Sequence, residues 1–326
     1  MSITFQKSGI LTTLQDLGRF GYRRFGVNPN GAMDESAARL VNILIGNPDT
    51  SGNEAVLEMH FPAPQIVFEA NAVIAIGGAS LSPDLDDEPI ENWRPYFAKK
   101  GSQLKFQNKT NGNRAYLAVH GGFKLHRWLE SASTNLAAKI GGLDGRKLAV
   151  GDRLSFNIEV NTPPDLARAR VSISLLPSYS RFPTVRVIAG AEFGLLSEKS
   201  QQEILTHDFT ISTNSDRMGF RLQGQPIALS RPYELVSAAV SFGTVQLLPD
   251  GQLIVLMADH QTSGGYPRIA HVISRDLPLV AQLGANDKVA FHMISLDEAE
   301  QLALEFENEL NFFRVGCRFQ TRSWNI

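Results

Sequence analysis

The clearest structural signal in the chain is the run Leu253-Ile254-Val255-Leu256-Met257-Ala258 with the polar stretch after it, Asp259-His260-Gln261-Thr262-Ser263-Gly264-Gly265-Tyr266-Pro267. Six apolar residues followed by a turn rich in glycine predict a buried β-strand, and a second apolar run resumes at residues 269–273. The turn gathers a carboxylate, an imidazole, an amide and hydroxyls at a strand end, where a rigid scaffold can hold loop residues for binding or catalysis. The alternative is that these groups only build a hydrogen-bonded turn that closes a β-barrel.

Short apolar runs bounded by turn signals recur on both sides of this stretch. They lie at residues 56–58, 65–68, 72–76, 104–106 and 116–119 in the first half, and at 171–176, 185–188, 209–211, 244–247 and 288–291 in the second. Runs this short, at this spacing, are typical of sandwiches and barrels rather than of βαβ units. We therefore predict a mainly β protein with two β-barrel domains and a few peripheral helices.

Three helices and one domain boundary are also predicted. Asp34 is a good N-cap for a helix at about residues 34–46, Ser197 for a short helix reaching 205, and Ser295 with Glu298 forms a capping box for a terminal helix. The stretch Asn161-Thr162-Pro163-Pro164 can continue neither an α-helix nor the hydrogen-bond ladder of a β-sheet. We expect an N-terminal domain at residues 1–162 and a C-terminal domain at 163–326.

The composition excludes several classes of protein. The chain has 326 residues, of which 43% are apolar and 20% charged, so it can bury a core. Its net charge of −2 argues against an electrostatic grip on nucleic acid or an acidic membrane. A single cysteine, Cys317, fits a reducing compartment. With no signal peptide and no long apolar span expected, we predict a cytoplasmic protein.

Several catalytic motifs are missing from the sequence. There is no Gly-Lys dipeptide for a Walker A loop, no His-Glu-x-x-His, no Gly-x-Ser-x-Gly, and no Met-Lys pair of the kind that carries biotin. The seven histidines have no ligand spacing, so we expect no metal site.

The polar turn is the first candidate site. Asp259 or His260 is the candidate general base, because a tuned carboxylate or an imidazole can move protons near neutral pH. If strand geometry continues, Gln261 lies on the same side as Asp259. Orienting or anion-binding roles are predicted for Gln261, Thr262, Tyr266 and the backbone of Gly264 and Gly265.

Two further clusters are candidates. Asp216 is a possible catalytic carboxylate, and Arg217 and Arg221 are four residues apart, so in an extended segment both face one side and suit a carboxylate or phosphate. The alternative is a structural Asp–Arg ion pair. Gln246, on a predicted strand, joins the binding candidates. In the first half of the chain the binding candidates are Gln15, Asp16 and Arg19, which lie beside a glycine-rich loop.

Taken in order, the motifs resemble the KipA-like family, which comprises the C subunit of bacterial 5-oxoprolinase and is related to the allophanate hydrolase subunit 2 and carboxyltransferase part of urea carboxylase. The matching stretches are Thr13–Arg19, Gly31–Asp34, Gly46–Asn47, Leu57–Glu58, Ala118–Gly122, Ser215–Gly219 and Asp259–Pro267. The resemblance implies cyclophilin-like β-barrel domains. It also implies a cytoplasmic complex, formed with the A and KipI-like B subunits, that hydrolyses 5-oxo-L-proline to L-glutamate with ATP.

The resemblance leaves two other functions open. The urea carboxylase branch moves a carboxyl group from biotin to urea, but its loop differs from Gln261-Thr262 and Tyr266-Pro267 here, so biotin is not expected. Some relatives instead act as regulators that bind a KipI-like kinase inhibitor. If the chain belongs to a hydrolase, Arg217 and Arg221 hold the substrate carboxylate or phosphate, and Asp259 or His260 manages protons.

Overall fold

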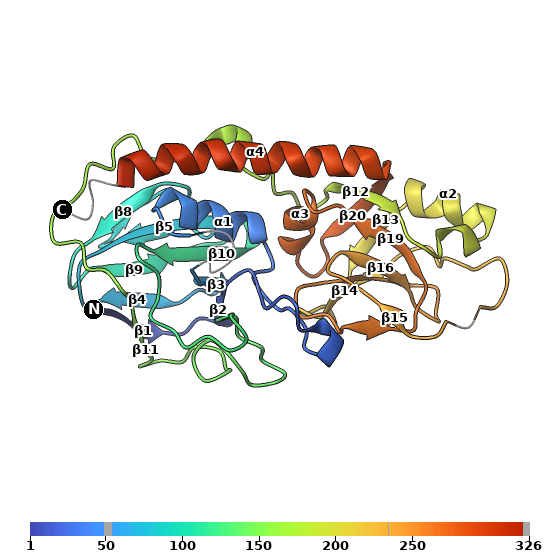
Figure 1. The fold of residues 1–326 in the computed structure, drawn as a ribbon, viewed down its shortest axis with the longest axis horizontal. Helices are drawn as coiled ribbons and strands as arrows, with labels where there is room; N and C mark the ends of the chain where they lie inside the picture. The colour runs from blue at the N-terminus through green and yellow to red at the C-terminus, as the bar shows by residue number, and fades with distance from the viewer. Residues whose placement is uncertain (49–53, 234, 322–326) are drawn as a thin grey trace. The chain divides into compact units, whose positions relative to one another are not determined.

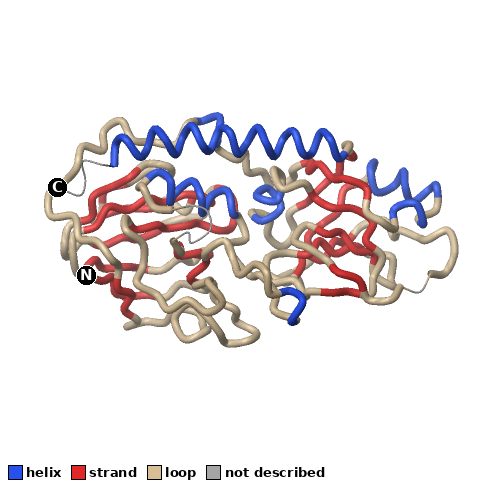
Figure 2. Tube along the Cα trace, viewed as in Figure 1, coloured by secondary structure: helices blue, strands red, loops and turns tan. Residues whose placement is uncertain are grey.

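The computed structural model describes residues 1–48, 54–233 and 235–321, which form two compact units. Unit 1 comprises Met1–Arg19, Asn30–Pro177 and the chain from Glu307 on, and unit 2 comprises Phe20–Pro29 and Ser178–Phe306. Strands predominate in each unit, with few helices (Figures 1 and 2). The prediction of a mainly β protein is therefore confirmed.

Unit 1 contains two antiparallel sheets. The first has the strand order β11-β1-β4-β9-β6-β7, with β11 (Arg153–Ser155), β1 (Ser2–Lys7), β4 (Gln65–Phe68), β9 (Gln103–Phe106), β6 (Pro83–Leu85) and β7 (Glu88–Pro89). The second has the order β2-β3-β10-β5-β8, with β2 (Thr12–Gln15), β3 (Val56–His60), β10 (Asn111–Val119), β5 (Ala72–Ser80) and β8 (Pro95–Ala98).

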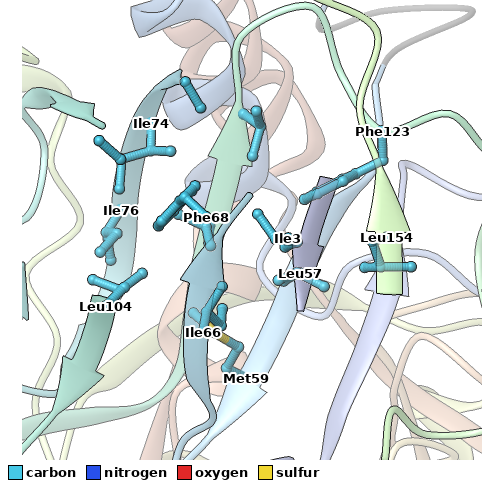
Figure 3. Packing of buried hydrophobic residues seen from close by; sticks show 14 of the residues in the cluster. Ile3, Leu57, Met59, Ile66, Phe68, Ile74, Ile76, Leu104, Phe123 and Leu154 are labelled. Carbon is cyan, nitrogen blue, oxygen red and sulfur yellow. The ribbon is translucent and has the colours of Figure 1, made fainter. Parts of the chain in front are cut away.

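Both sheets contribute to one hydrophobic core. Ile3, Ile66 and Phe68 come from the first sheet, and Leu57 and Ile74 come from the second (Figure 3). Each of these side chains is essentially inaccessible to solvent, and burying one stabilises the fold by roughly 1.5–3 kcal/mol. Four of these residues, all but Ile3, lie in strands that the sequence predicted.

The helix predicted near Asp34 is α1 (Glu35–Leu44). The Asp34 carboxylate accepts a hydrogen bond from the backbone N–H of Ala37 at 2.8 Å, as expected of an N-cap. Gly46 follows the helix with a φ of 75°, a left-handed conformation that glycine adopts without strain.

Unit 2 is built on a closed barrel with the strand order β12-β19-β16-β17-β14-β13-β20. Its strands are β12 (Thr184–Ala189), β19 (Arg268–Val272), β16 (Thr244–Leu247), β17 (Leu253–Leu256), β14 (Gly219–Gln223), β13 (Asp208–Ile211) and β20 (Lys288–Met293). A short ribbon pairs β15 (Ala238–Ala239) with β18 (Ser263–Gly264). The predicted strand at 253–258 is thus β17, although it ends two residues early.

The remaining helices are short except the last. They are η1 (Arg23–Phe25), η2 (Ile173–Leu175), η3 (Phe193–Leu195), α2 (Glu198–Thr206), α3 (Leu277–Ala281) and α4 (Leu296–Thr321). Ser197 caps α2, and the Ser295 hydroxyl accepts from the backbone N–H of Glu298 at 3.2 Å, so both predicted starts hold. None of the helices in the described ranges is long and apolar enough to cross a membrane.

The run at residues 171–176 is not a strand. Val171 donates its backbone N–H to the Trp93 carbonyl, and η2 then turns the chain so that Ile173 is 87% exposed. Alternating apolar residues predicted a strand here, but no neighbouring strand pairs with them among the described residues.

The compact units differ from the expected split at residues 162 and 163. The segment 20–29 belongs to unit 2, where the Asn28 amide donates to the Asp259 carbonyl at 3.1 Å. The end of α4 belongs to unit 1, where Glu307 pairs with Arg39. These contacts join segments that are far apart in sequence, so local composition did not indicate them.

We predict that Gly190→Ala destabilises unit 2 by about 2–3 kcal/mol, because its Cβ would overlap backbone atoms of Arg268 across the β12–β19 pair and lie 2.8 Å from the Ala270 nitrogen. Urea unfolding of the two variants and the wild type measures the change. The matched control is Gly194→Ala, whose Cβ would meet nothing within 4 Å. Equal midpoints for the two variants would contradict this packing.

Candidate functional site

A hollow of about 500 Å³ lies on the barrel of unit 2. This volume falls in the range of small-molecule sites. Five of the residues selected from the sequence line it: Asp216, Arg221, Gln246, Gln261 and Tyr266. The other lining residues are Asn214, Met218, Gly219, Leu248, Pro249, Asp250, Ile254 and Leu256.

The floor of the hollow is the outer face of three neighbouring strands. Arg221 on β14 pairs in register with Ile254 on β17, which pairs with Gln246 on β16, so the three side chains form one row. The adjacent row, Phe220 and Val255, is buried. Because side chains alternate along a strand, the buried row fills the barrel and the row of Arg221 faces the hollow.

The polar turn covers part of this floor. Gln246 is fully buried, and its amide Nε2 donates to the backbone carbonyl of Tyr266 at 3.2 Å. Gln261 is half-buried and Tyr266 is 43% exposed, and both line the hollow. The turn predicted as a site therefore forms a wall of the hollow.

An ion pair holds the start of this turn. Arg217 donates from Nε to one carboxylate oxygen of Asp259 at 2.9 Å and from an Nη to the other at 3.1 Å. The backbone repeats the contact, because the Asp259 N–H donates to the Arg217 carbonyl at 2.8 Å. Both side chains are largely buried, at 7% and 13% exposed. With its carboxylate engaged in this way, Asp259 anchors the turn and is a poor candidate for the general base.

The expectation that Arg217 and Arg221 share one face does not hold. Asp216 accepts from the backbone N–H groups of Met218 and Gly219, so the chain turns at 216–218 and β14 begins only at Gly219. This turn breaks the period of two. Arg217 consequently points to Asp259, and Arg221 is exposed on the hollow.

Strand geometry also ends before Gln261. The His260 N–H donates to the Met257 carbonyl, so the chain turns and Gln261 lines the hollow while Asp259 does not. Thr262 accepts at its carbonyl from the Val240 N–H, and Gly265 lies near Ser237. Thr262, Gly264 and Gly265 are not among the residues that line the hollow.

His260 is buried beneath the turn, with Nδ1 2.6 Å from the Gln261 carbonyl oxygen. Burial lowers the pKa of His260, and the bond to the Gln261 carbonyl opposes that shift only in part. The imidazole is not among the residues that line the hollow, so its contact here is with the backbone.

The three candidates from the first half belong to unit 1. The carboxylate of Asp16 accepts from the hydroxyls of Ser131 and Ser133 and from the backbone N–H groups of Gly18 and Ala132, at 2.5–2.8 Å. Arg19 is buried and donates to Asn30 and to the Ser133 carbonyl. Gln15 is fully buried and donates to Thr13 and Thr134. These bonds join the end of β2 and the residues that follow it to the loop at 131–135, so we assign the three residues a structural role.

Other motif residues of unit 1 have a similar role. Glu58 accepts from the Tyr116 hydroxyl at 2.9 Å and from the Met33 N–H at 2.8 Å. Burial, with the nearby Glu58 carboxylate, raises the pKa of Tyr116 well above its usual value. Tyr116 therefore remains protonated and can donate this bond.

Sequence reasoning did not select several other lining residues as site candidates, including Asn214, Asp250, Ile254 and Leu256. Ile254 and Leu256 lie in the predicted strand, but all six residues of the run 253–258 are apolar, so the sequence does not show which of them face outward. Asp250 lies in the turn between β16 and β17, and no pattern in the sequence placed it beside Asp216.

Comparison with known proteins identifies the family. The model of the carboxyltransferase domain, subdomains A and B, matches residues 25–293. The chain belongs to this carboxyltransferase-domain family. It is 39% identical to the C subunit of 5-oxoprolinase from Haemophilus influenzae over 93% of this chain and 94% of that protein. It is 36% identical to the C subunit of 5-oxoprolinase from Escherichia coli over 93% of this chain and 98% of that protein.

A solved structure of the carboxyltransferase-domain family has the same fold. The urea amidolyase of K. lactis superposes with a TM-score of 0.89 at 29% identity, covering 96% of this chain and 20% of that one. The chain thus corresponds to one part of that larger protein and to nearly the full length of the two bacterial subunits.

We predict that the Arg217–Asp259 pair is coupled. Asp259→Asn and Arg217→Gln alone should each destabilise unit 2 by about 3 kcal/mol, because each removes the opposite charge from a largely buried partner. The double variant should lose at least about 1 kcal/mol less free energy of unfolding than the sum of the losses of the two single variants. Urea unfolding provides the double-mutant cycle, and strictly additive costs would refute the coupling.

We also predict that unit 2 loses stability as pH falls below about 6.5, the usual pKa of histidine. Burial lowers the pKa values of His260 and His271, so the unfolded chain takes up protons more readily than the folded one, and acid favours unfolding. The stability that these neutral histidines provide is present above that pH. The double variant His260→Gln/His271→Gln should have a flatter profile between pH 5 and 7, measured by urea unfolding. An unchanged slope would show that other groups cause the acid sensitivity.

Proposed function

We propose that the chain is a subunit of a 5-oxoprolinase, which opens the lactam ring of 5-oxo-L-proline to give L-glutamate. One observation carries the proposal: the hollow of unit 2 combines a guanidinium, Arg221, with carboxamide side chains and a phenol. The substrate has a carboxylate and a lactam edge, which need a cation and amide-type partners respectively. The two bacterial relatives, each named as the C subunit of 5-oxoprolinase, support the same assignment.

Arg221 is the residue we assign to the substrate carboxylate. It is exposed on the floor of the hollow, and a guanidinium forms two parallel hydrogen bonds with a carboxylate. Arg217, which the sequence placed beside it, is engaged by Asp259. These roles differ from the sequence-based prediction, because we assign Arg217 to support of the turn and only Arg221 to binding of the substrate carboxylate.

Asp216 is the lining carboxylate that we assign to proton transfer. Two backbone N–H groups fix its Oδ1, at 2.8 and 3.3 Å, and so orient the carboxylate. Opening the ring requires water to attack the activated lactam carbon and to lose a proton, and a positioned carboxylate can accept it. Asp259 and His260 are less suited, because neither lines the hollow.

The hollow is a poor fit for the phosphates of ATP. Asp216 and Asp250 line it together with Arg221, so a triphosphate would meet two like charges and one opposite charge. In a 5-oxoprolinase, ATP supplies the activation that a resonance-stabilised lactam needs. We therefore assign ATP to another part of the complex, formed with the A and KipI-like B subunits.

A second candidate function is a biotin-dependent carboxyltransferase component. The TM-score of 0.89 to the K. lactis urea amidolyase favours it. The two proposals differ in their co-reactant, so avidin separates them: it should inhibit the carboxyltransferase and leave lactam hydrolysis unchanged.

We predict that the chain, copurified with the A and B subunits, gives phosphate release that depends on 5-oxo-L-proline. Arg221→Met should raise KM for 5-oxo-L-proline by roughly 10- to 100-fold, because a charge-assisted hydrogen bond is lost. Arg170→Met, at an exposed position of unit 1, is the control. If phosphate release by the wild-type complex does not depend on 5-oxo-L-proline, the proposed hydrolase function is wrong. If Arg221→Met leaves KM unchanged, Arg221 does not bind the substrate.

A further inference from the structure

The side chain of Gln246 is unusual for its position. It lies on the outer face of the barrel and lines the hollow, yet it is fully buried because the turn covers it. Its Nε2 donates to the Tyr266 carbonyl, while its Oε1 has no hydrogen-bond partner within the described protein. Burying a carbonyl-type acceptor without a donor costs about 1–3 kcal/mol. Unlike Gln15, another buried amide whose oxygen has no partner among the described residues, the Gln246 side chain lines the hollow, so its Oε1 is an acceptor at the edge of the candidate ligand site.

A second amide lies next to it across a glycine. A Cβ on Gly264 would lie 2.8 Å from Nε2 of Gln246 and 3.4 Å from Nε2 of Gln261, so both amides border one point. Gln261 is half-buried and lines the hollow, and no hydrogen bond of its side chain is found in the described ranges. We name Gln246, Gln261 and Gly264 the carboxamide corner. The absence of a side chain at Gly264 keeps this corner open.

The donating bond fixes the orientation of Gln246. Oxygen and nitrogen of a glutamine amide are assigned from their partners, and a carbonyl such as that of Tyr266 can pair only with the NH₂ group. Oε1 is therefore the end that remains for a donor. Gln261 has both ends of its amide to offer.

We propose that the carboxamide corner reads the lactam edge of the substrate. In a five-membered lactam the N–H and C=O lie on the same side, so a primary amide can pair with both at once, donating to the carbonyl and accepting from the N–H. We assign this two-bond pairing to Gln261. The lactam has a single N–H, which can be shared between Oε1 of Gln261 and the neighbouring Oε1 of Gln246, because both amides border one point. This inference rests on the proposed function and adds the group that selects lactams.

The corner is placed to work together with Arg221. Gln246 and Arg221 lie two strands apart in the same row, which is roughly 10 Å at the usual strand spacing. The long arginine side chain can cross Ile254 towards the corner. A small ring with a carboxylate beside its N–H can therefore contact both.

We expect the corner to discriminate against the ring-oxygen analogue of the substrate, 5-oxotetrahydrofuran-2-carboxylate, which has the same shape and carboxylate but no N–H. The reconstituted wild-type complex should bind 5-oxo-L-proline at least about 100-fold more tightly than this lactone, because the lactone leaves buried acceptors unpaired. Isothermal titration of each compound into the complex measures the ratio.

The variants Gln261→Met and Gly264→Ala should each reduce that ratio to within about 3-fold, mainly by weakening lactam binding, because one removes the pairing amide and the other fills the corner. Gln246→Met should reduce it partly. Gln223→Met, on the same barrel but outside the hollow, is the matched control and should keep the wild-type ratio.

The possible outcomes separate the two proposals. If the wild-type complex hydrolyses 5-oxo-L-proline but Gln261→Met keeps the lactam preference, the corner is not the lactam reader and the proposed function stands. An equal loss of both ligands in folded Gln261→Met would also overturn the inference, since it would indicate a structural role. If the wild-type complex neither binds nor hydrolyses 5-oxo-L-proline, the proposed function fails and the inference with it.

Discussion

The ion pair between Arg217 and Asp259 is the interaction on which the site of unit 2 depends. It joins the turn before β14 to the turn after β17, and a backbone hydrogen bond between the same two residues extends the ladder. The turn at 259–267 therefore leaves the barrel at a fixed position and folds back over Gln246. Without this ion pair the first residues of the turn would not be held in place. The hollow would then lose the wall that carries Gln261 and Tyr266. Asp259, a predicted general base, and Arg217, a predicted ligand of the substrate carboxylate or phosphate, are thus better explained as the support for their neighbours.

The motif residues of unit 1 also act mainly as supports. Asp16 accepts four hydrogen bonds from serines and backbone groups, and Glu58 receives a hydroxyl and an N–H. A buried carboxylate is stable only when donors surround it, so such residues fix the loops that they contact. Belonging to the carboxyltransferase-domain family accounts for the presence of these motifs, but the chemistry we propose lies in unit 2.

Much of the fold could be predicted from the sequence because its signals are local. The strands around Leu57, Ile74 and Val255 follow from short apolar runs, and the starts of α1 and α4 follow from Asp34 and Ser295, whose caps involve only residues nearby. What failed depended on where a strand begins and on which strands pair. The turn that Asp216 imposes separated Arg217 from Arg221, the run at 171–176 had no strand to pair with, and Asp250 reaches the hollow only through the barrel's closure. Periodicity cannot show at which residue a strand begins, and that residue decides which side chains line the hollow.

We propose that a small lactam acid binds on the outer face of the barrel, between Arg221 and the carboxamide corner. The most direct test is a crystal structure of the reconstituted complex with 5-oxo-L-proline. We expect the substrate carboxylate within hydrogen-bond distance of the Arg221 guanidinium and the lactam edge against Gln261 and Gln246. Density for the substrate elsewhere in the complex, with this hollow holding only solvent, would contradict it.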